Sequence, residues 1–217
     1  MAELTTKTAG DVATEVKRLF GDEDAVQISD NDIIRWVNDA QRKIVSVNPI
    51  LQDRAIRDVV AGQAEYPYPP ERVQYIQAIL YDGIPLEGIS YAEAQEYILK
   101  AEEGAREAEV PKIWYQWAQT IVLWPKPSKS LTGGLTMDYL AIPEEVTGLL
   151  DTLSVPDRYF ETVIDHVMVK AHLLDEDYSA ADFARSRVSE TLGQLSEQEN
   201  KPRHATYPTM TVLAEDL

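Results

Sequence analysis

Segments with helical periodicity at both ends of the chain enclose a middle rich in strand-forming residues. Apolar side chains recur at intervals of three and four residues in segments 7–20, 28–47, 156–174 and 178–199. Each amphipathic helix must bury its apolar face against another element, so the helices from the two chain ends must close on each other. This layout predicts an antiparallel helical bundle built from residues 1–54 and 144–200.

Local signals mark where these helices begin and end. Ser29 is suited to cap the second helix, and Asp30 and Asp32 complement the positive end of its dipole. Asn48-Pro49 ends that helix. The side chains predicted to face the core are Val12, Val16, Leu19 and Phe20 in the first helix, and Ile33, Val37, Ala40, Ile44 and Val47 in the second.

Residues 55–143 change to short runs of strand formers bounded by turn residues. The predicted strands are 55–61, 73–81, 84–86, 112–117, 120–124 and 135–140, the last one preceded by Gly133-Gly134. Ser90-Tyr-Ala-Glu93 is a capping box that opens a helix to about Lys100, and a loop over 105–109 follows. The middle is therefore expected to be a β-rich insertion, a small antiparallel sandwich or barrel, in an α+β protein.

The last segment, residues 201–217, has two prolines and no helical period, which predicts an extended C-terminal arm. Prolines lower the entropy that such an arm loses on docking. The alternation in Thr209–Leu213 would let it add a strand to a partner sheet, while disorder in the free protein is the alternative. The candidate interface residues in the arm are Arg203, Tyr207, Met210, Val212 and Leu213.

The formal net charge of −17 is the strongest compositional feature, and no basic block interrupts it. Because neutralised phosphates supply most nucleic-acid affinity, adhesion to DNA is disfavoured. Simple solubility is the plainer explanation of the acidity. The chain has no cysteine for disulfides or thiolate metal sites, and no apolar stretch long enough to span a membrane. The N-terminus lacks a secretion signal, so a cytoplasm-like compartment is expected.

Motifs for catalysis or metal binding are not formed. Ser90 lacks the second glycine of a nucleophile elbow and is better explained as a helix cap. His166 and His172 are six residues apart, which places them on different sides of a helix. The acidic segment that begins at Asp175 resembles the start of a calcium-binding loop, but it lacks the glycine and glutamate that such a loop needs. We therefore expect a protein that is not an enzyme and that has no cofactor or metal.

Two groups of aromatic side chains are open to more than one interpretation. Trp114, Tyr115, Trp117 and Trp124 alternate along two predicted strands, which favours packing over a platform for sugars or bases. Trp36 lies off the apolar stripe of its helix, beside Arg35 and near Arg42. An exposed Trp with neighbouring Arg is typical of interface hot spots, and packing under the β-rich lobe is the equal alternative.

An ordered series of motifs resembles the head-to-tail adaptor (connector) proteins of tailed double-stranded-DNA phages. Ile33-Ile-Arg-Trp-Val-Asn-Asp-Ala-Gln-Arg-Lys-Ile44 is similar to the opening helix of that family. The further matching segments, in order, are 62–69, 81–90, 111–115, 121–127, 135–139, 155–159 and 174–178. The resemblance covers roughly residues 5–195, and its motifs are structural, so it assigns no catalytic residue.

This resemblance implies a ring of about twelve copies beneath the portal protein of the capsid. DNA would pass through its lumen without specific binding, and a tail, nozzle or tail-tube protein would attach below. The helical bundle would form the ring wall and the arm would reach the portal. The expected location is the head–tail junction of the virion, with assembly in the host cytoplasm and no membrane contact.

Two other classes of function are compatible with the sequence. One is a carbohydrate-binding or hydrolytic module that uses the Trp-rich lobe. The other is a small acidic regulatory protein that acts as a monomer or dimer.

Overall fold

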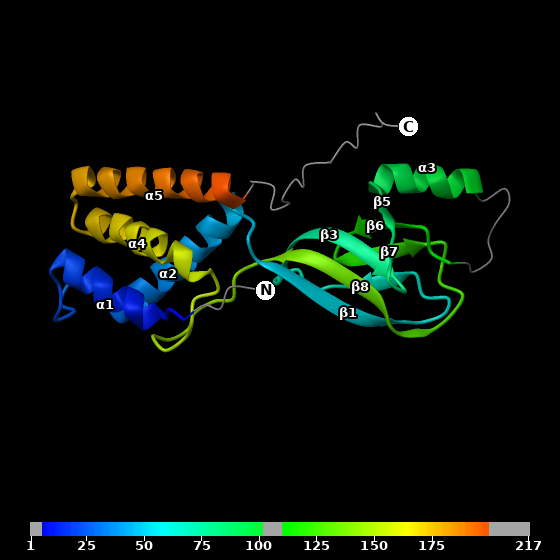
Figure 1. Cartoon of the computed structure of the whole chain (residues 1–217), viewed down its shortest axis with the longest axis horizontal. Coiled ribbons are helices and arrows are strands. Elements are labelled where there is room, and N and C mark those ends of the chain that lie inside the picture. The colour runs from blue at the N-terminus through cyan, green and yellow to red at the C-terminus, as the bar shows by residue number, and fades with distance from the viewer. Residues whose placement is uncertain (1–5, 102–109, 200–217) are drawn as a thin grey trace, which may run out of the picture.

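The structure, a computed structural model, describes residues 6–101 and 110–199 of the 217-residue chain. These residues form five α-helices and two four-stranded sheets, so the predicted α+β class is confirmed. Figure 1 shows an elongated molecule, with α1, α2, α4 and α5 at one end and the strands with α3 at the other. No helix in the described ranges combines the length and the apolar character needed to cross a membrane.

The second helix begins at its predicted cap, whereas α1 begins at Ala9, two residues after the predicted start. α1 (Ala9–Phe20) starts with a capping box between Thr8 and Asp11, and Gly21 ends it in the left-handed conformation with φ 81°. α2 (Asp30–Val47) is capped by the Ser29 hydroxyl, which accepts a hydrogen bond from the Asp32 N–H. Local chemistry therefore decides these boundaries.

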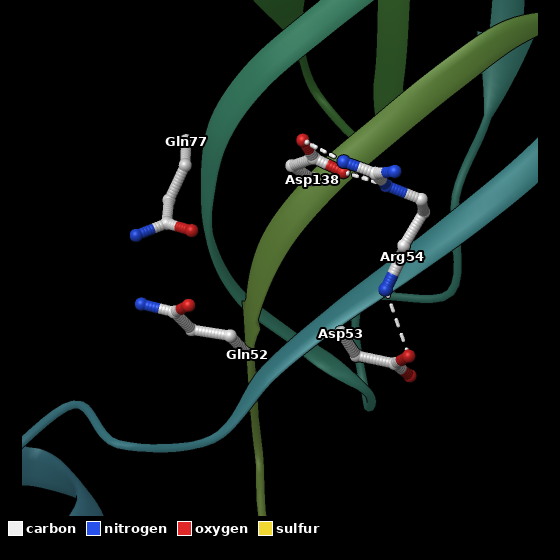
Figure 2. A pocket seen from close by; sticks show the side chains of 5 residues that line it. All are labelled: Gln52, Asp53, Arg54, Gln77 and Asp138. Atoms are coloured by element: carbon white, nitrogen blue, oxygen red, sulfur yellow. Dashed lines mark hydrogen bonds and ion pairs between the residues drawn. The ribbon is translucent and has the colours of Figure 1, made fainter. Parts of the chain in front are cut away.

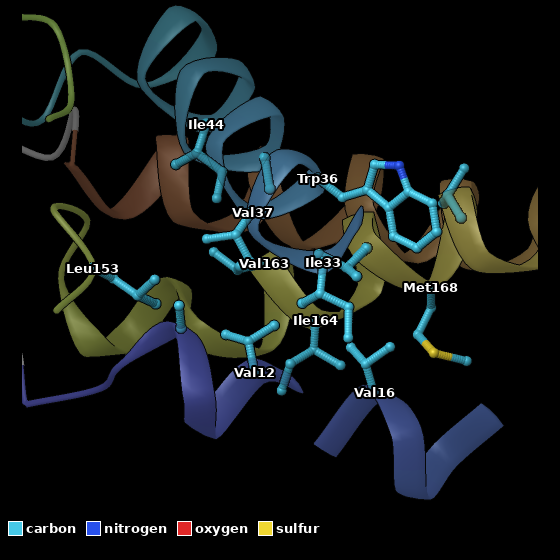
Figure 3. Close-up of a cluster of buried hydrophobic side chains, with 14 of the residues drawn as sticks. Val12, Val16, Ile33, Trp36, Val37, Ile44, Leu153, Val163, Ile164 and Met168 are labelled. Carbon is cyan, nitrogen blue, oxygen red and sulfur yellow. The ribbon is translucent and has the colours of Figure 1, made fainter. Parts of the chain in front are cut away.

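The C-terminal helices are α4 (Phe160–Leu174), preceded by a 3₁₀ turn (Asp157–Tyr159), and α5 (Tyr178–Glu199). α4 contacts α1, α2 and α5, and buried side chains of all four helices belong to one hydrophobic cluster. Figure 3 shows part of this cluster, including Val12 and Val16 from α1, Ile33, Val37 and Ile44 from α2, and Val163, Ile164 and Met168 from α4. One core therefore joins helices from both ends of the chain.

Two residues assigned to the apolar helix faces are not buried. Leu19 is 50% exposed and Val47 is 44% exposed. Both lie in the last turn of their helices. The prediction that they face the core is wrong.

The strands form two separate sheets, one with the order β1-β8-β3-β4 and one with the order β2-β7-β6-β5. Their bounds are β1 Gln52–Val59, β2 Glu65–Pro67, β3 Val73–Tyr81, β4 Ile84–Pro85, β5 Glu87–Gly88, β6 Ile113–Trp117, β7 Thr120–Trp124 and β8 Leu131–Ala141. All neighbours pair antiparallel except β5, which joins β6 in parallel. The arrangement is neither a closed barrel nor fully antiparallel.

Buried side chains of both sheets share a second cluster, which includes Ile79 of β3, Leu123 of β7 and Met137 of β8. Helix α3 (Tyr91–Ala101) covers the other face of the second sheet, where Ala94 is fully buried with Tyr115 and Val122. Ser90 and Glu93 form the predicted capping box of α3 through reciprocal hydrogen bonds of 3.3 and 2.8 Å. The predicted loop over 105–109 lies outside the described residues.

The predicted start of the last strand, at Leu135, is wrong. β8 begins at Leu131 and runs through Gly133 and Gly134. Gly133 adopts a φ of 64°, and a Cβ on Gly134 would lie 2.5 Å from the Leu131 Cβ, so glycine is required where the strand bends. The Gly133-Gly134 pair, which was expected to precede the strand, is therefore part of it.

The shared helical core should dominate stability at its end of the molecule. Replacing fully buried Ile33 by alanine should lower the free energy of unfolding by about 2–5 kcal/mol, because the cavity cannot fully collapse. The control Ile84→Ala, at a side chain that is 62% exposed, should stay within about 0.5 kcal/mol of wild type. Urea denaturation followed by circular dichroism measures both, and equal losses would contradict a buried role for Ile33.

Candidate interaction surfaces

Trp36 does not lie on the surface. It is 6% exposed and belongs to the helical cluster, and Figure 3 draws it in the same group as Met168 of α4. The prediction of an exposed Trp36 is wrong, and the helical cluster, not the β-rich lobe, buries it. The physical reason is that α2 contacts α1, α4 and α5, so it buries a wider face than its Ile33–Val37–Ala40 stripe.

The two arginines near Trp36 differ in their surroundings. The Arg35 side chain is 67% exposed and pairs only locally, with Asp32 one turn earlier at 2.9 Å. Arg42 binds Asp39 at 3.0 Å and also Glu145 at 2.7 Å, which follows β8 by four residues in the chain. Arg42 therefore ties α2 to the connector, defined as residues 142–156 between β8 and the 3₁₀ turn, while Arg35 stays available on the helix surface.

Two further α2 residues, which the sequence did not single out, bind the connector. Asn38 donates to the Val146 carbonyl at 2.9 Å and accepts from the Val146 N–H at 2.8 Å. Fully buried Gln41 accepts the Ser154 N–H at 2.6 Å. Two amide side chains at i and i+3 on one helix were the available signal, because amides that pack against another segment need hydrogen-bond partners.

The 3₁₀ turn that follows the connector holds the start of α1. Asp157 accepts hydrogen bonds from the Thr6 hydroxyl at 2.6 Å, the Thr6 N–H at 3.0 Å and the Lys7 N–H at 3.3 Å. These bonds, led by the one from the Thr6 hydroxyl, hold the pKa of Asp157 below its usual range. The Ala9 N–H adds a bond of 3.0 Å to the Asp151 carbonyl. The two chain ends are thus joined by hydrogen bonds as well as by the core.

A shallow depression of about 330 Å³ lies on the outer face of the first sheet, lined by Gln52, Asp53, Arg54, Gln77 and Asp138 (Figure 2). Arg54 and Asp138 form a two-point ion pair of 2.5 and 2.8 Å, and the Arg54 side chain lowers the pKa of Asp138. The Tyr139 hydroxyl and the Arg54 N–H lower the pKa of Asp53. Both carboxyls are therefore ionised at neutral pH, so neither is suited to act there as a general acid.

The aromatic side chains of β6 and β7 mostly pack against the fold. Tyr115 is buried, Trp114 packs on the inter-sheet cluster, and Trp124 meets Tyr97 of α3 edge to face at 5.2 Å. Trp117 is 53% exposed, but Tyr91 of α3 stacks on it at 4.3 Å. Packing, the favoured interpretation, is confirmed for the first three, whereas Trp117 remains half open to solvent.

The candidate residues Arg203, Tyr207, Met210, Val212 and Leu213 lie outside the described residues. Within residues 6–101 and 110–199, no group of three or more histidine and acidic side chains is placed to hold a metal ion. His166 lies partly buried on α4, and that burial lowers its pKa. His172 contacts the ring of Phe20 on α1 at 5.6 Å.

The groups described above on this α+β fold are ion pairs, hydrogen-bonded amides and exposed apolar side chains. Its sequence matches the family model described as SU10 adaptor protein over residues 7–211, nearly the whole chain. The protein belongs to this family of phage head-to-tail adaptors, which confirms the resemblance found in the sequence. None of the curated proteins matches the chain.

The hydrogen bonds to Asp157 should make stability depend on pH. Because the folded-state pKa of Asp157 is lowered from 3.8, its contribution is present above that value and is lost as pH falls through the folded-state pKa. Asp157→Asn should therefore destabilise the protein at neutral pH and progressively less in acid. Thr6→Val, which keeps the backbone donors, should show a smaller effect. Urea unfolding at a series of pH values measures this, and a pH-independent difference would contradict it.

Proposed function

We propose that this protein is a structural component of the virion that forms a ring of about twelve copies between the portal and the tail. The ring extends the DNA channel below the portal and provides the attachment site for a tail, nozzle or tail-tube protein. The observation that carries this proposal is the family match over residues 7–211. Portal and tail proteins are the partners that a head-to-tail adaptor joins.

The elongated architecture supports two separate roles. We assign residues 1–54 and 144–200 to an antiparallel helical bundle that forms the ring wall, and residues 55–143 to a β-rich lobe. The strands and the four helices have separate buried clusters, which is what two structural units require. Residues 201–217 form the arm that reaches the portal in this proposal, with Arg203, Tyr207, Met210, Val212 and Leu213 as contacts.

The electrostatics support free passage of DNA. The net charge is −17, and seven arginines in the described part of the chain form ion pairs with carboxylates. These pairs include Arg18–Glu15, Arg54–Asp138, Arg72–Glu144 and Arg185–Asp182. Because these positive charges are offset by neighbouring acids and the chain as a whole is strongly acidic, phosphates gain little by approaching. DNA therefore passes through the lumen without specific binding.

Assembly in this proposal depends on many weak contacts. Once a ring begins to close, each further contact forms at a high effective concentration, so single interfaces need not be strong. Arg35 is a candidate contact because its charge lies on the exposed face of α2. The chain acts in this proposal without catalysis or cofactor, assembles in the host cytoplasm and ends at the head–tail junction.

Deletion of residues 201–217 tests the role of the arm. The full-length chain should assemble into rings on purified portal protein, visible by electron microscopy and by mass, and the truncated chain should not. The truncated protein should keep the circular-dichroism spectrum and unfolding transition of its remaining domains. Unchanged assembly of the truncated chain would remove the arm's docking role, and failure of the full-length chain to bind portal would contradict the adaptor function.

Arg35 and Arg42 provide a matched pair of substitutions. Arg35→Ala should change the free energy of unfolding by less than about 0.5 kcal/mol, because its ion pair with Asp32 is exposed and local. It should nevertheless weaken assembly on portal. Arg42→Ala should lower stability by up to about 1 kcal/mol, since it releases the connector at a half-exposed ion pair. Wild-type assembly by Arg35→Ala would exclude Arg35 from the interface.

A further inference from the structure

Two loops meet at the end of the molecule farthest from the strands, and together they form a surface that we call the distal tip. One loop joins α1 to α2 and the other joins α4 to α5 (Figure 1). The contact between the rings of Phe20 and His172, with centroids 5.6 Å apart, holds the two ends side by side. The large apolar side chains exposed here are Leu19, Val26, Leu173, Leu174 and Tyr178.

The first loop is held rigidly. The Asp22 carboxylate is buried and accepts hydrogen bonds from the backbone N–H groups of Val26, Gln27 and Ile28 at 2.8, 2.9 and 2.8 Å. These bonds, led by that from Ile28, hold the pKa of Asp22 below its usual range. Val26 is nevertheless 83% exposed, so a fixed backbone presents an apolar side chain to solvent.

The second loop is ordered in the same way. The Asp175 N–H donates to the Ala171 carbonyl at 3.1 Å and the Asp177 N–H to the His172 carbonyl at 2.9 Å. Each loop also keeps one residue other than glycine in the left-handed region, Ala25 at φ 54° and Glu176 at φ 59°. That conformation is unfavourable for such residues and persists only where the surrounding structure imposes it. Both loops are therefore preorganised, which lowers the entropy lost on binding.

The charges of the distal tip indicate what can cover its apolar side chains. The exposed acidic residues of the two loops are Glu23, Asp24, Asp175, Glu176 and Asp177. Nearby Arg18 is occupied by Glu15 at 2.5 Å. The tip of a second copy would bring the same negative charge, and DNA phosphates would be repelled as well. A protein surface with lysine and arginine around an apolar cleft is complementary both to the apolar side chains of the tip and to its negative charge.

We propose that the distal tip docks such a basic-rimmed apolar cleft on another protein of the head–tail junction. This inference rests on the proposed adaptor function and adds a second docking surface, separate from the arm. Leu174 and Val26, 56% and 83% exposed, are the apolar anchors, and the surrounding acids orient the partner and speed its encounter.

The test joins heads and tails in vitro. Portal-bearing heads and free tails are purified from phage that lacks this protein, the full-length chain is added, and joined particles are counted by electron microscopy and infectivity. Val26→Ser with Leu174→Ser removes the anchors, and Glu23→Lys with Glu176→Lys reverses charge. Each pair should reduce joining by about tenfold or more, and the charge reversal should also remove the sensitivity of joining to salt.

Matched controls lie on the β-rich lobe. Val60→Ser with Leu99→Ser changes the same residue types at sites that are 49% and 66% exposed, and Glu71→Lys with Glu87→Lys makes the same charge change. Both controls should join particles as wild type does, and all variants should keep the wild-type unfolding midpoint.

The outcomes separate this inference from the adaptor function. Joining by the tip variants at the wild-type level would overturn the inference alone and leave the adaptor function in place. A tip variant that instead changes the mass of the free protein would show that a second copy covers the tip, which also overturns it. Failure of the wild-type chain to join particles would remove both.

Discussion

Burial of side chains from both chain ends in one helical core is the constraint on which the rest of this structure depends. Tyr159 and Ile164 near the start of α4 are fully or almost fully buried in the same cluster as Val12 of α1 and Ile33 of α2. Because these residues are far apart in the chain, their packing fixes both ends of the strand-rich segment. The strand-rich segment is therefore an insertion whose two ends both connect to the same helical core.

The connector reinforces that closure with polar groups. Asn38 and Gln41 of α2 bind its backbone, and Arg42 binds its side chain Glu145. Asp157, in the 3₁₀ turn that follows the connector, binds the chain before α1. Buried backbone groups that lack regular secondary structure need such partners, since each unpaired group costs about 1–3 kcal/mol.

Sequence patterns were most successful where local chemistry decides the structure. The capping residues Ser29 and Ser90 and the bounds of β3 and β7 follow from a few neighbouring residues. The pattern failed where distant segments meet. Gly134 lies within β8 at a point where the pairing with β1 shifts register, and Trp36 is buried because α2 contacts α1, α4 and α5.

The sequence by itself therefore determined the identities and boundaries of most helices, the α+β class, the acidic charge and the family to which the chain belongs. Only the tertiary structure decided that Trp36 packs inside, that Arg42 serves the connector, and that β5 joins β6 in parallel. It also brought the two loops of the distal tip together. Periodicity and caps act over a few residues, whereas exposure and strand partners depend on segments that the chain brings together from far apart.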